Sequence, residues 1–365
     1  MDVTAAITRA AGAPFEFATV RLDDPRPDEV RVRIAAVGVC HTDLVARDGA
    51  MPIALPAVFG HEGAGVVDAV GADVTKVKPG DRVAITFRSC GACDRCASGD
   101  PAYCYMMPAL NYIGMRPDGS KALHEGEADV SSNFFGQSSF ASYALAYERN
   151  LVRLPDDIPF ELAAPLGCGI QTGAGGVMLA LAAPAGSSIL ITGGGAVGLS
   201  AVMGAAIQGC STIIVLEPHA GRRDLAKALG ATHVLDPAAG DLSAAVRTVL
   251  PHGVDYAFDT TGRPDVLGAI MGCLAPKGVL GVVGIPPPGT PLPGDMGSVL
   301  TFGQTVRGII EGDSDPDEFL PRLIDEWRAG RLPLEKLVKT WPFAEINAAI
   351  EAQHHGDCVK VVLTL

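Results

Sequence analysis

The stretch 187–218, SSILITGGGAVGLSAVMGAAIQGCSTIIVLEP, constrains the fold of this chain more than any other. It reads as an apolar strand, a glycine-rich turn, an alanine-rich helix and a second apolar strand that ends at Glu217. Gly193, Gly195 and Gly198 have the spacing G-x-G-x-x-G. Alone this spacing is a weak signal, but between a strand and a helix, with an acid downstream, it predicts a dinucleotide-binding unit.

Each part of that unit has a physical reason. The first glycine permits the tight turn, the second lets the backbone approach the pyrophosphate, and the third allows close helix–strand packing. The phosphates are expected at the helix N-terminus. Glu217 can accept both ribose hydroxyls, which favours NAD over NADP. Arg222 and Arg223 leave the 2′-phosphate open as an alternative; we expect Arg222 at the adenosine ribose and Arg223 in solvent.

The segments on either side predict two different domains. From 222 to 285, strand-like and helix-like segments alternate, which implies a parallel sheet with right-handed crossovers. Before Pro155, short strand-like segments are separated by Pro- and Gly-rich turns, which indicates a compact β-rich body. A short helix is expected over 42–48, and the segment 105–135 is expected to be a long irregular loop that forms a pocket wall. A length of 365 residues suits two domains of roughly 150 residues each.

A cysteine-rich loop lies within the first part. Cys90, Cys93, Cys96 and Cys104 have the spacing C-x2-C-x2-C-x7-C. Four thiolates on one short loop can close a tetrahedron around zinc with no open position, which is a structural site. Disulfides fit a cytosolic-looking chain poorly. An iron–sulfur cluster stays open on spacing alone, although Tyr105 stands where bacterial ferredoxins have proline.

A second set of metal-ligand residue types lies in GVCHTD and GHEGAG. Cys40 and His61 are preferred zinc ligands, and each has a nearby acid, Asp43 or Glu62, that could orient it. The alternative is a buried Cys and a surface His that never meet. The remaining thiols and imidazoles lack such a pattern. We expect the thiols to be core residues and the imidazoles to be at the surface: Cys168, Cys210, Cys273 and Cys358, and His124, His354 and His355.

Charge and hydropathy exclude some partners. The formal net charge is −13 and the pI is about 5.0, so the surface repels nucleic-acid backbones. No apolar run of the length a membrane span needs is free of Gly, Pro or charge. The N-terminal stretch has no basic segment followed by an apolar core, so a signal peptide is not expected. We therefore expect a cytoplasmic protein with no membrane or nucleic-acid partner.

Taken together, these motifs resemble a known family. GVCHTD, GHEGAG, the four-cysteine loop, LGCGIQTG and GGGAVG occur in the order and spacing of the zinc-dependent medium-chain alcohol dehydrogenases, and the resemblance covers essentially the whole chain. Within that superfamily the chain is most similar to the bacterial aryl (benzyl) alcohol dehydrogenases, on FFGQSSFASYA, PLGCGIQTGAGG and GIIEGDSDPDEFLPRLI. The resemblance implies an α/β chain with a GroES-like β-rich zinc domain over 1–169 and 310–365. A Rossmann NAD-binding domain with a doubly wound parallel sheet is implied over 170–309.

The resemblance also implies roles for individual residues. The ligands of a catalytic zinc are Cys40, His61 and Cys168, and those of a structural zinc are Cys90, Cys93, Cys96 and Cys104. The residues of the catalytic machinery are Thr42, which takes the alcohol proton, and His41, Asp43 and Glu62. The residues at the cofactor are Gly193, Gly195, Val197, Gly198, Glu217, Arg222, Thr172, Val283, Ile285 and Lys360, with His41 also near the pyrophosphate. The residues of the substrate pocket are Phe87, Phe134 and Phe135.

The implied activity is zinc-dependent, NAD-linked oxidation of primary, aromatic alcohols to aldehydes, and the reverse reduction, with two zinc ions per subunit. Alternatives are a zinc dehydrogenase for terpenoid or secondary alcohols or for S-hydroxymethylglutathione, and a non-catalytic NAD-binding redox sensor. Many relatives carry a His three residues after the Thr, where this chain has Val45, so the proton must leave by another route. Family members are dimers or tetramers, so a homo-oligomer is expected.

Overall fold

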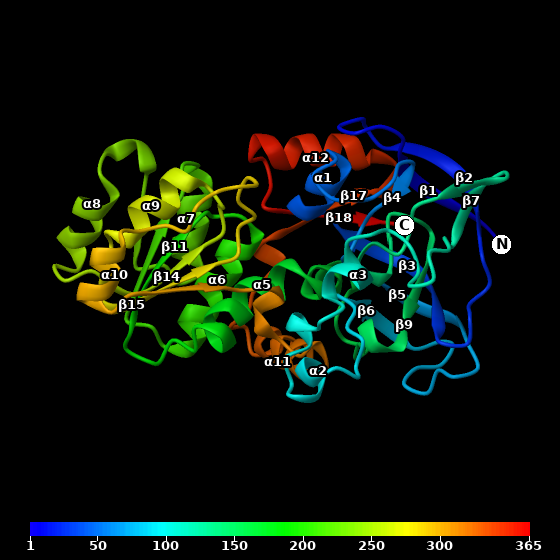
Figure 1. The fold of residues 1–365 in the computed structure, drawn as a ribbon, viewed down its shortest axis with the longest axis horizontal. Helices are drawn as coiled ribbons and strands as arrows, with labels where there is room; N and C mark the ends of the chain where they lie inside the picture. The colour runs from blue at the N-terminus through cyan, green and yellow to red at the C-terminus, as the bar shows by residue number, and fades with distance from the viewer. The chain divides into compact units, whose positions relative to one another are not determined.

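The computed structural model describes residues 1–365 as two compact units (Figure 1). The first unit comprises Met1–Cys168, Asp315–Asp325 and Leu337–Leu365, and the second comprises Gly169–Ser314 and Glu326–Lys336. Gly169 and residues 310–314 and 326–336 therefore lie with the second unit, whereas the expected domain ranges put them in the first.

The larger sheet of the first unit contains the strands that lead into Cys40 and into the four-cysteine loop. Its strand order is β10-β6-β5-β3-β18-β17, and β9 also pairs with β3. All neighbours are antiparallel except β17 and β18. The strands are β3 (Glu29–Gly38), β5 (Gly63–Val70), β6 (Arg82–Ile85), β9 (Tyr143–Tyr147), β10 (Leu151–Arg153), β17 (Val338–Pro342) and β18 (Lys360–Thr364).

A smaller sheet of order β4-β1-β2-β7-β8 completes the β-rich body. Its strands are β1 (Asp2–Thr8), β2 (Glu16–Leu22), β4 (Ala57–Val58), β7 (Leu123–Glu125) and β8 (Ala128–Val130). Side chains from both sheets form one apolar core that includes Ile7, Val32, Phe59, Ile85 and Phe140. Burying each such side chain fully contributes about 1.5–3 kcal/mol.

The helices of the first unit are short and connect strands. They are α1 (His41–Arg47), α2 (Asp94–Ala97), α3 (Met107–Asn111), α4 (Phe160–Ala163) and α12 (Ile346–His355), with 3-10 turns η1 (Pro101–Tyr103), η2 (Phe134–Gly136), η3 (Glu148–Asn150), η4 (Ala164–Gly167) and η9 (Phe343–Glu345). The helix α11 (Pro316–Arg328) contributes residues to both units.

Two expectations for the first unit need correction. The segment 105–135 is less irregular than its sequence suggests, because it contains α3 and the β7–β8 hairpin. His124 on β7 is not a free surface residue. Its Nε2 lies 3.1 Å from an Asp23 carboxylate oxygen and its Nδ1 lies 2.9 Å from one of Asp129. Two acids that come from other strands and turns hold this imidazole, which the local sequence does not reveal.

The second unit is built on a six-stranded parallel sheet of order β13-β12-β11-β14-β15-β16, as predicted. Its strands are β11 (Ser188–Thr192), β12 (Thr212–Leu216), β13 (His233–Leu235), β14 (Val254–Asp259), β15 (Leu274–Val282) and β16 (Thr305–Gly308). The strand order reverses between β11 and β14, and ligands of such sheets bind beyond the carboxyl ends of the strands at that point.

Helices cover both faces of this sheet. They are α5 (Gly169–Gly175), the π-helical turn η5 (Gly176–Ala180), α6 (Ala196–Gln208), α7 (Ala220–Ala228), α8 (Leu242–Val249), α9 (Pro264–Met271) and α10 (Met296–Phe302), with 3-10 turns η6 (Pro237–Ala239), η7 (Glu311–Asp313) and η8 (Leu334–Lys336). Successive strand residues face opposite sides. Leu190 packs with Val246 and Ile270 of α8 and α9, whereas a side chain at Gly176 would meet the Phe258 ring on the other face.

No single helix is long and apolar enough to cross a membrane. Phe160–Gly167 and Gly169–Ala180 are long and apolar enough only when taken together, and the helix is broken between them.

Candidate functional site

Four side chains from three separate stretches of the first unit converge on one point. The ligand atoms of Cys40, His61, Glu62 and Cys168 all lie within 4.8 Å of one another. His61 and Glu62 are fully buried in the turn between β4 and β5, Cys40 directly precedes α1, and Cys168 directly follows η4. The alternative in which Cys40 and His61 never meet is therefore wrong.

Asp43 orients the imidazole and the start of α1 together. Its Oδ1 accepts hydrogen bonds from His61 Nδ1 at 2.7 Å and from the Gly60 N–H at 3.0 Å. Its Oδ2 accepts from the Cys40 N–H at 3.0 Å, so it caps the helix that it belongs to. A carboxylate on one ring nitrogen fixes the tautomer of a metal-binding histidine and leaves the other nitrogen available.

The donor set fits zinc. With Nδ1 bound to Asp43, the other ring nitrogen of His61, Nε2, is buried and has no hydrogen-bond partner. The Cys168 thiol lowers the pKa of the Cys40 thiol well below its usual range, against the opposing effect of burial. Two thiolates and one imidazole are the protein ligands of a zinc site with one open position.

Glu62 is paired with Lys360, a residue that the resemblance places at the cofactor. Lys360 Nζ lies 2.5 Å from a Glu62 carboxylate oxygen and donates to the Val39 carbonyl at 2.9 Å. Both side chains are buried. Gly38 makes room for the pair, since a Cβ there would lie 1.9 Å from the carboxylate of Glu62 and 3.1 Å from Cε of Lys360. A contact between Lys360 and the pyrophosphate stays a prediction.

The residues that follow Cys40 begin α1. Thr42 is half-buried, and its hydroxyl oxygen lies 3.7 Å from the Cys40 sulfur. His41 is exposed, and Val45 is half-buried one turn further on. The hydroxyl of Thr42 thus lies beside a candidate zinc ligand, whereas the side chain of Val45 carries no group that could pass on a proton.

Aromatic rings enclose the imidazole. Phe135 stacks on His61 with ring centroids 4.4 Å apart and an interplanar angle of 24°, and Phe134 meets the same ring edge-on at 5.4 Å. Phe87, Phe134 and Phe135 are all buried. Phe135 has a φ of +52°, which costs a bulky residue about 1–2 kcal/mol. With this strained backbone, the ring lies against the imidazole of His61.

The four cysteines of the second motif also converge. The sulfur of Cys93 lies 3.6 Å from that of Cys96 and 3.9 Å from that of Cys104, and Cys90 lies 3.9 Å from Cys96. All four are free thiols with their sulfurs within 4.8 Å of one another. Four sulfurs bound to one zinc at about 2.3 Å in a tetrahedron are about 3.8 Å apart. The spacing suits a single ion and excludes disulfides among these cysteines.

The glycine-rich turn after β11 has the geometry that a pyrophosphate needs. Gly193 has a φ of +95°, and a Cβ on Gly198 would lie 1.8 Å from the Gly193 carbonyl oxygen. A Cβ on Gly195 would meet nothing within 4 Å, so open space adjoins the backbone before α6. Glu217 is buried after β12, where its two carboxylate oxygens accept from the Gly194 N–H at 2.6 Å and the His219 N–H at 2.8 Å.

One arginine of this region is not where the sequence suggested. Arg223, expected in solvent, lies 3.0 Å from an Asp236 carboxylate oxygen and donates to the Glu217 and Pro218 carbonyls. It therefore secures the loop that carries Glu217. Arg222 is half-buried, and its contact with the ribose stays a prediction.

An acid that the sequence analysis did not single out lies beside Thr172. A Glu311 carboxylate oxygen accepts from Gln171 Nε2 at 3.1 Å and from the Thr172 hydroxyl at 3.4 Å. Glu311, Gly312 and Asp313 all have positive φ, so this loop is held in a strained conformation against α5. The only sequence signal was the stretch GIIEGDS. The other expected cofactor positions are at the start of α6 and after β15: Val197, Val283 and Ile285.

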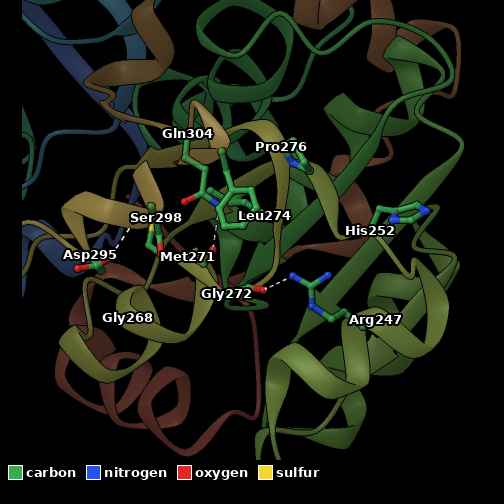
Figure 2. A pocket seen from close by; sticks show the side chains of 12 residues that line it. Arg247, His252, Gly268, Met271, Gly272, Leu274, Pro276, Asp295, Ser298 and Gln304 are labelled. Carbon is green, nitrogen blue, oxygen red and sulfur yellow. Dashed lines mark hydrogen bonds between the residues drawn. The ribbon is translucent and has the colours of Figure 1, made fainter. Parts of the chain in front are cut away.

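A cavity of about 480 Å³ in the second unit is separate from the glycine-rich turn (Figure 2). It is lined by Met271 at the end of α9, Leu274 at the start of β15, Ser298 of α10 and Gln304 just after α10. Two of the lining residues are joined by a hydrogen bond, in which the guanidinium of Arg247 donates to the Gly272 carbonyl (Figure 2); the two atoms are 3.0 Å apart. The glycine-rich turn follows the carboxyl end of β11, whereas this cavity adjoins the amino end of β15. It is therefore not the nucleotide site.

Comparisons with known proteins match both units. Residues 26–156 match the model of the alcohol dehydrogenase GroES-like domain, and residues 196–326 match that of the zinc-binding dehydrogenase domain. The chain is 48% identical to a geraniol dehydrogenase of Castellaniella defragrans, over 100% of this chain and 98% of the other.

Two solved structures are similar over their whole length. An alcohol dehydrogenase zinc-binding domain protein from Burkholderia ambifaria is 48% identical with a TM-score of 0.97, over 100% of this chain and 99% of the other. The benzyl alcohol dehydrogenase of Acinetobacter calcoaceticus is 41% identical with a TM-score of 0.96, over the same shares.

Proposed function

The chain belongs to the zinc-dependent medium-chain alcohol dehydrogenases, and we propose that within this family it oxidises primary aromatic alcohols to aldehydes with NAD, and catalyses the reverse reduction. The observation that carries this proposal is the convergence of Cys40, His61 and Cys168, with the unpartnered Nε2 of His61 among the ligand atoms. When bound, zinc would acidify the alcohol oxygen and NAD would accept the hydride.

The chain's own residues supply orientation and proton transfer. Asp43 holds the His61 ring so that Nε2 faces the two thiols. The Thr42 hydroxyl lies beside Cys40, where it would accept the proton of a substrate alcohol held next to these ligands. Phe135 and Phe134 cover the imidazole and keep water from it. Val45 offers no acceptor, so Thr42 would pass the proton to water or, with NAD bound, through a ribose hydroxyl and His41.

The carboxylate of Glu217 supports NAD over NADP. Two backbone N–H groups hold it in place, so it presents a localised negative charge beside the glycine-rich turn. Such a carboxylate can accept hydrogen bonds from ribose hydroxyls and repels a 2′-phosphate. Arg223 is engaged with Asp236 and with backbone carbonyls, which reduces the positive charge available for a phosphate.

The aromatic substrate class rests on two observations. Phe134 and Phe135 are buried against the His61 ring, Phe87 is also buried, and aromatic rings favour planar substrates. The benzyl alcohol dehydrogenase of A. calcoaceticus is similar over the whole chain. A second candidate is a terpenoid alcohol, since the C. defragrans relative is a geraniol dehydrogenase.

A steady-state survey of alcohols tests the proposal. Purified enzyme is given NAD with benzyl alcohol, geraniol, 2-propanol or the glutathione–formaldehyde adduct, and NADH formation is followed by absorbance. The highest kcat/KM with benzyl alcohol is the expected result. The highest value with geraniol favours the terpenoid class. No alcohol-dependent NADH with any of them, together with reversible thiol oxidation, favours a redox sensor.

We further propose that the chain forms a homo-oligomer through the second unit. The strand β16 is at the edge of the parallel sheet and pairs only with β15. Beside it in sequence, Leu292, Met296 and Leu300 are each at least 80% exposed. An open sheet edge with exposed apolar side chains is a surface that a second copy can cover.

A further inference from the structure

The side chain of Gln137 joins segments of the first unit that are far apart in sequence. Its amide is 2% exposed, and both of its ends are used. Oε1 accepts from the Gly63 N–H at 3.0 Å and from the Ser139 hydroxyl at 2.7 Å. Nε2 donates to the carbonyls of His61 at 2.9 Å and Thr86 at 3.3 Å. A buried amide with this many partners is a fixed connection, because losing one partner leaves a desolvated polar group.

Two of these bonds are made to the backbone immediately before and immediately after Glu62. The His61 carbonyl and the Gly63 N–H belong to the peptide groups on either side of that residue. One side chain therefore sets the backbone of the turn that carries both His61 and Glu62. Asp43 sets the direction of the His61 ring, whereas Gln137 binds the backbone on both sides of Glu62.

The connection continues from Thr86 to the third metal ligand. The Thr86 hydroxyl donates to the Gly167 carbonyl at 2.7 Å, and Thr86 is fully buried. Gly167 directly precedes Cys168 and packs tightly, since a Cβ there would lie 2.3 Å from the Ile85 carbonyl oxygen. A continuous path of hydrogen bonds thus runs from His61 through Gln137 and Thr86 to the residue before Cys168.

The loop around Gln137 is held in a conformation that costs energy. Asn133, Phe135 and Ser138 are non-glycine residues with φ of +62°, +52° and +60°. The Asn133 side chain donates to the Tyr147 hydroxyl, and the Ser138 hydroxyl donates to the Val58 carbonyl at 2.7 Å. Such strain persists only where surrounding contacts determine the conformation, and it occurs mainly at functional sites.

We propose that Gln137 and Thr86 are positioning residues of the catalytic metal site, which fix the separation of His61 from Cys168 so that two distant segments present their ligands at one point. The inference rests on the metal role proposed for that site. Neither residue touches the ligand atoms, so both act through the backbones of the ligand-bearing segments. Residues that orient metal ligands typically change metal affinity by about 10–100-fold when they are lost.

Isosteric substitutions test the proposal. Thr86→Val removes the hydroxyl at constant shape, and Thr86→Ser keeps it. Gln137→Glu keeps the shape but replaces the donating NH2 group by a carboxylate oxygen, which would face the carbonyls of His61 and Thr86. Thr8→Val is the matched control, because Thr8 is equally buried and its hydroxyl has no partner. The four-cysteine loop is the internal control for Gln137→Glu, since Gln137 lies more than 30 residues beyond Cys104, whereas Cys90 follows Thr86 by four residues.

Zinc affinity is measured by competition with a chelator, with metal content counted by elemental analysis, and the geometry by the visible spectrum of the cobalt-substituted protein. Thr86→Val and Gln137→Glu are expected to weaken only the Cys40–His61–Cys168 site, by about 10–100-fold, and to shift its cobalt bands. Thr86→Ser and Thr8→Val are expected to behave as wild type.

Three results would overturn the inference. Wild-type affinity and spectra in both Thr86→Val and Gln137→Glu would show that the path does not position the ligands. Loss of both metals with a collapse of the melting temperature would assign the residues to folding alone. A wild-type protein that binds zinc only at the four-cysteine loop would overturn the inference together with the proposed function. The number of zinc ions bound per wild-type chain identifies this case without any variant.

Discussion

The ammonium of Lys360 lies 2.5 Å from the carboxylate of Glu62, and both groups are buried beside the converging side chains of Cys40, His61 and Cys168. Breaking a buried pair by removing one partner is strongly destabilising, because the other charge stays uncompensated. The pair therefore links the last strand, β18, to the turn that carries His61.

Lys360→Met should lower the free energy of unfolding by about 3–5 kcal/mol, because Glu62 would keep a buried charge without its partner. Chemical denaturation without cofactor measures this and avoids any effect on cofactor binding. The double variant Lys360→Met with Glu62→Gln should recover much of the loss. An unchanged unfolding midpoint in the single variant would show that the pair contributes nothing to stability.

Gly38→Ala should destabilise the first unit by about 1–3 kcal/mol, because the new methyl group would overlap the Glu62 carboxylate. Gly221→Ala in α7 is the matched control: a Cβ there would meet nothing within 4 Å. That change should be neutral or stabilise by about 0.4–1 kcal/mol, since alanine restricts the unfolded chain. Thermal unfolding of the two variants measures the difference, and equal melting temperatures would contradict the steric argument.

Glu217→Ser should shift the cofactor preference toward NADP. The change removes an acceptor for the ribose and a negative charge that repels a 2′-phosphate. The ratio of kcat/KM for NAD to that for NADP should fall by about 10–100-fold, as expected for a charge-assisted hydrogen bond worth about 1.5–3 kcal/mol. Glu217→Asp, which keeps the charge, is the control. A ratio that does not change would place the ribose elsewhere.

Glu148 should make stability depend on pH. Hydrogen bonds from the backbone N–H groups of Thr75 and Lys76 lower the pKa of this carboxyl below its ordinary value of 4.5. Its contribution is therefore fully present above about pH 4.5 and is lost as the pH falls through the lower folded-state pKa. Glu148→Gln should be less stable than wild type near neutral pH, and the gap should narrow in acid. A gap that is constant with pH would contradict this.

Leu300→Glu should weaken self-association, because it puts a charge among the exposed apolar side chains beside the β16 edge. Size-exclusion chromatography with light scattering should show a smaller mass than for wild type. Tyr105→Glu is the control, because it puts the same charge on an exposed apolar side chain of the first unit. Tyr105 is 64% exposed. A wild-type monomer, or an unchanged mass for Leu300→Glu, would contradict the proposed surface.

The local patterns predicted the parts of the site that depend on spacing. The positions of Cys40 before a helix, of Gly193 after a strand and of the four cysteines on one loop follow from short-range rules of backbone geometry and metal coordination. The parallel sheet followed from the alternation of strand and helix patterns. Cys168 alone carried no such signal, and only the resemblance to the family assigned it to the metal.

The sequence by itself determined which chemical groups are present and which of them lie a few residues apart. Only the tertiary structure decided that Glu62 meets Lys360, that Phe135 stacks on His61 and that Gln137 connects His61 to Thr86. The same holds for His124 and Arg223, which the fold places against acids rather than in solvent. Residues separated by tens or hundreds of positions meet through sheet register and buried polar networks, which no spacing along the chain encodes.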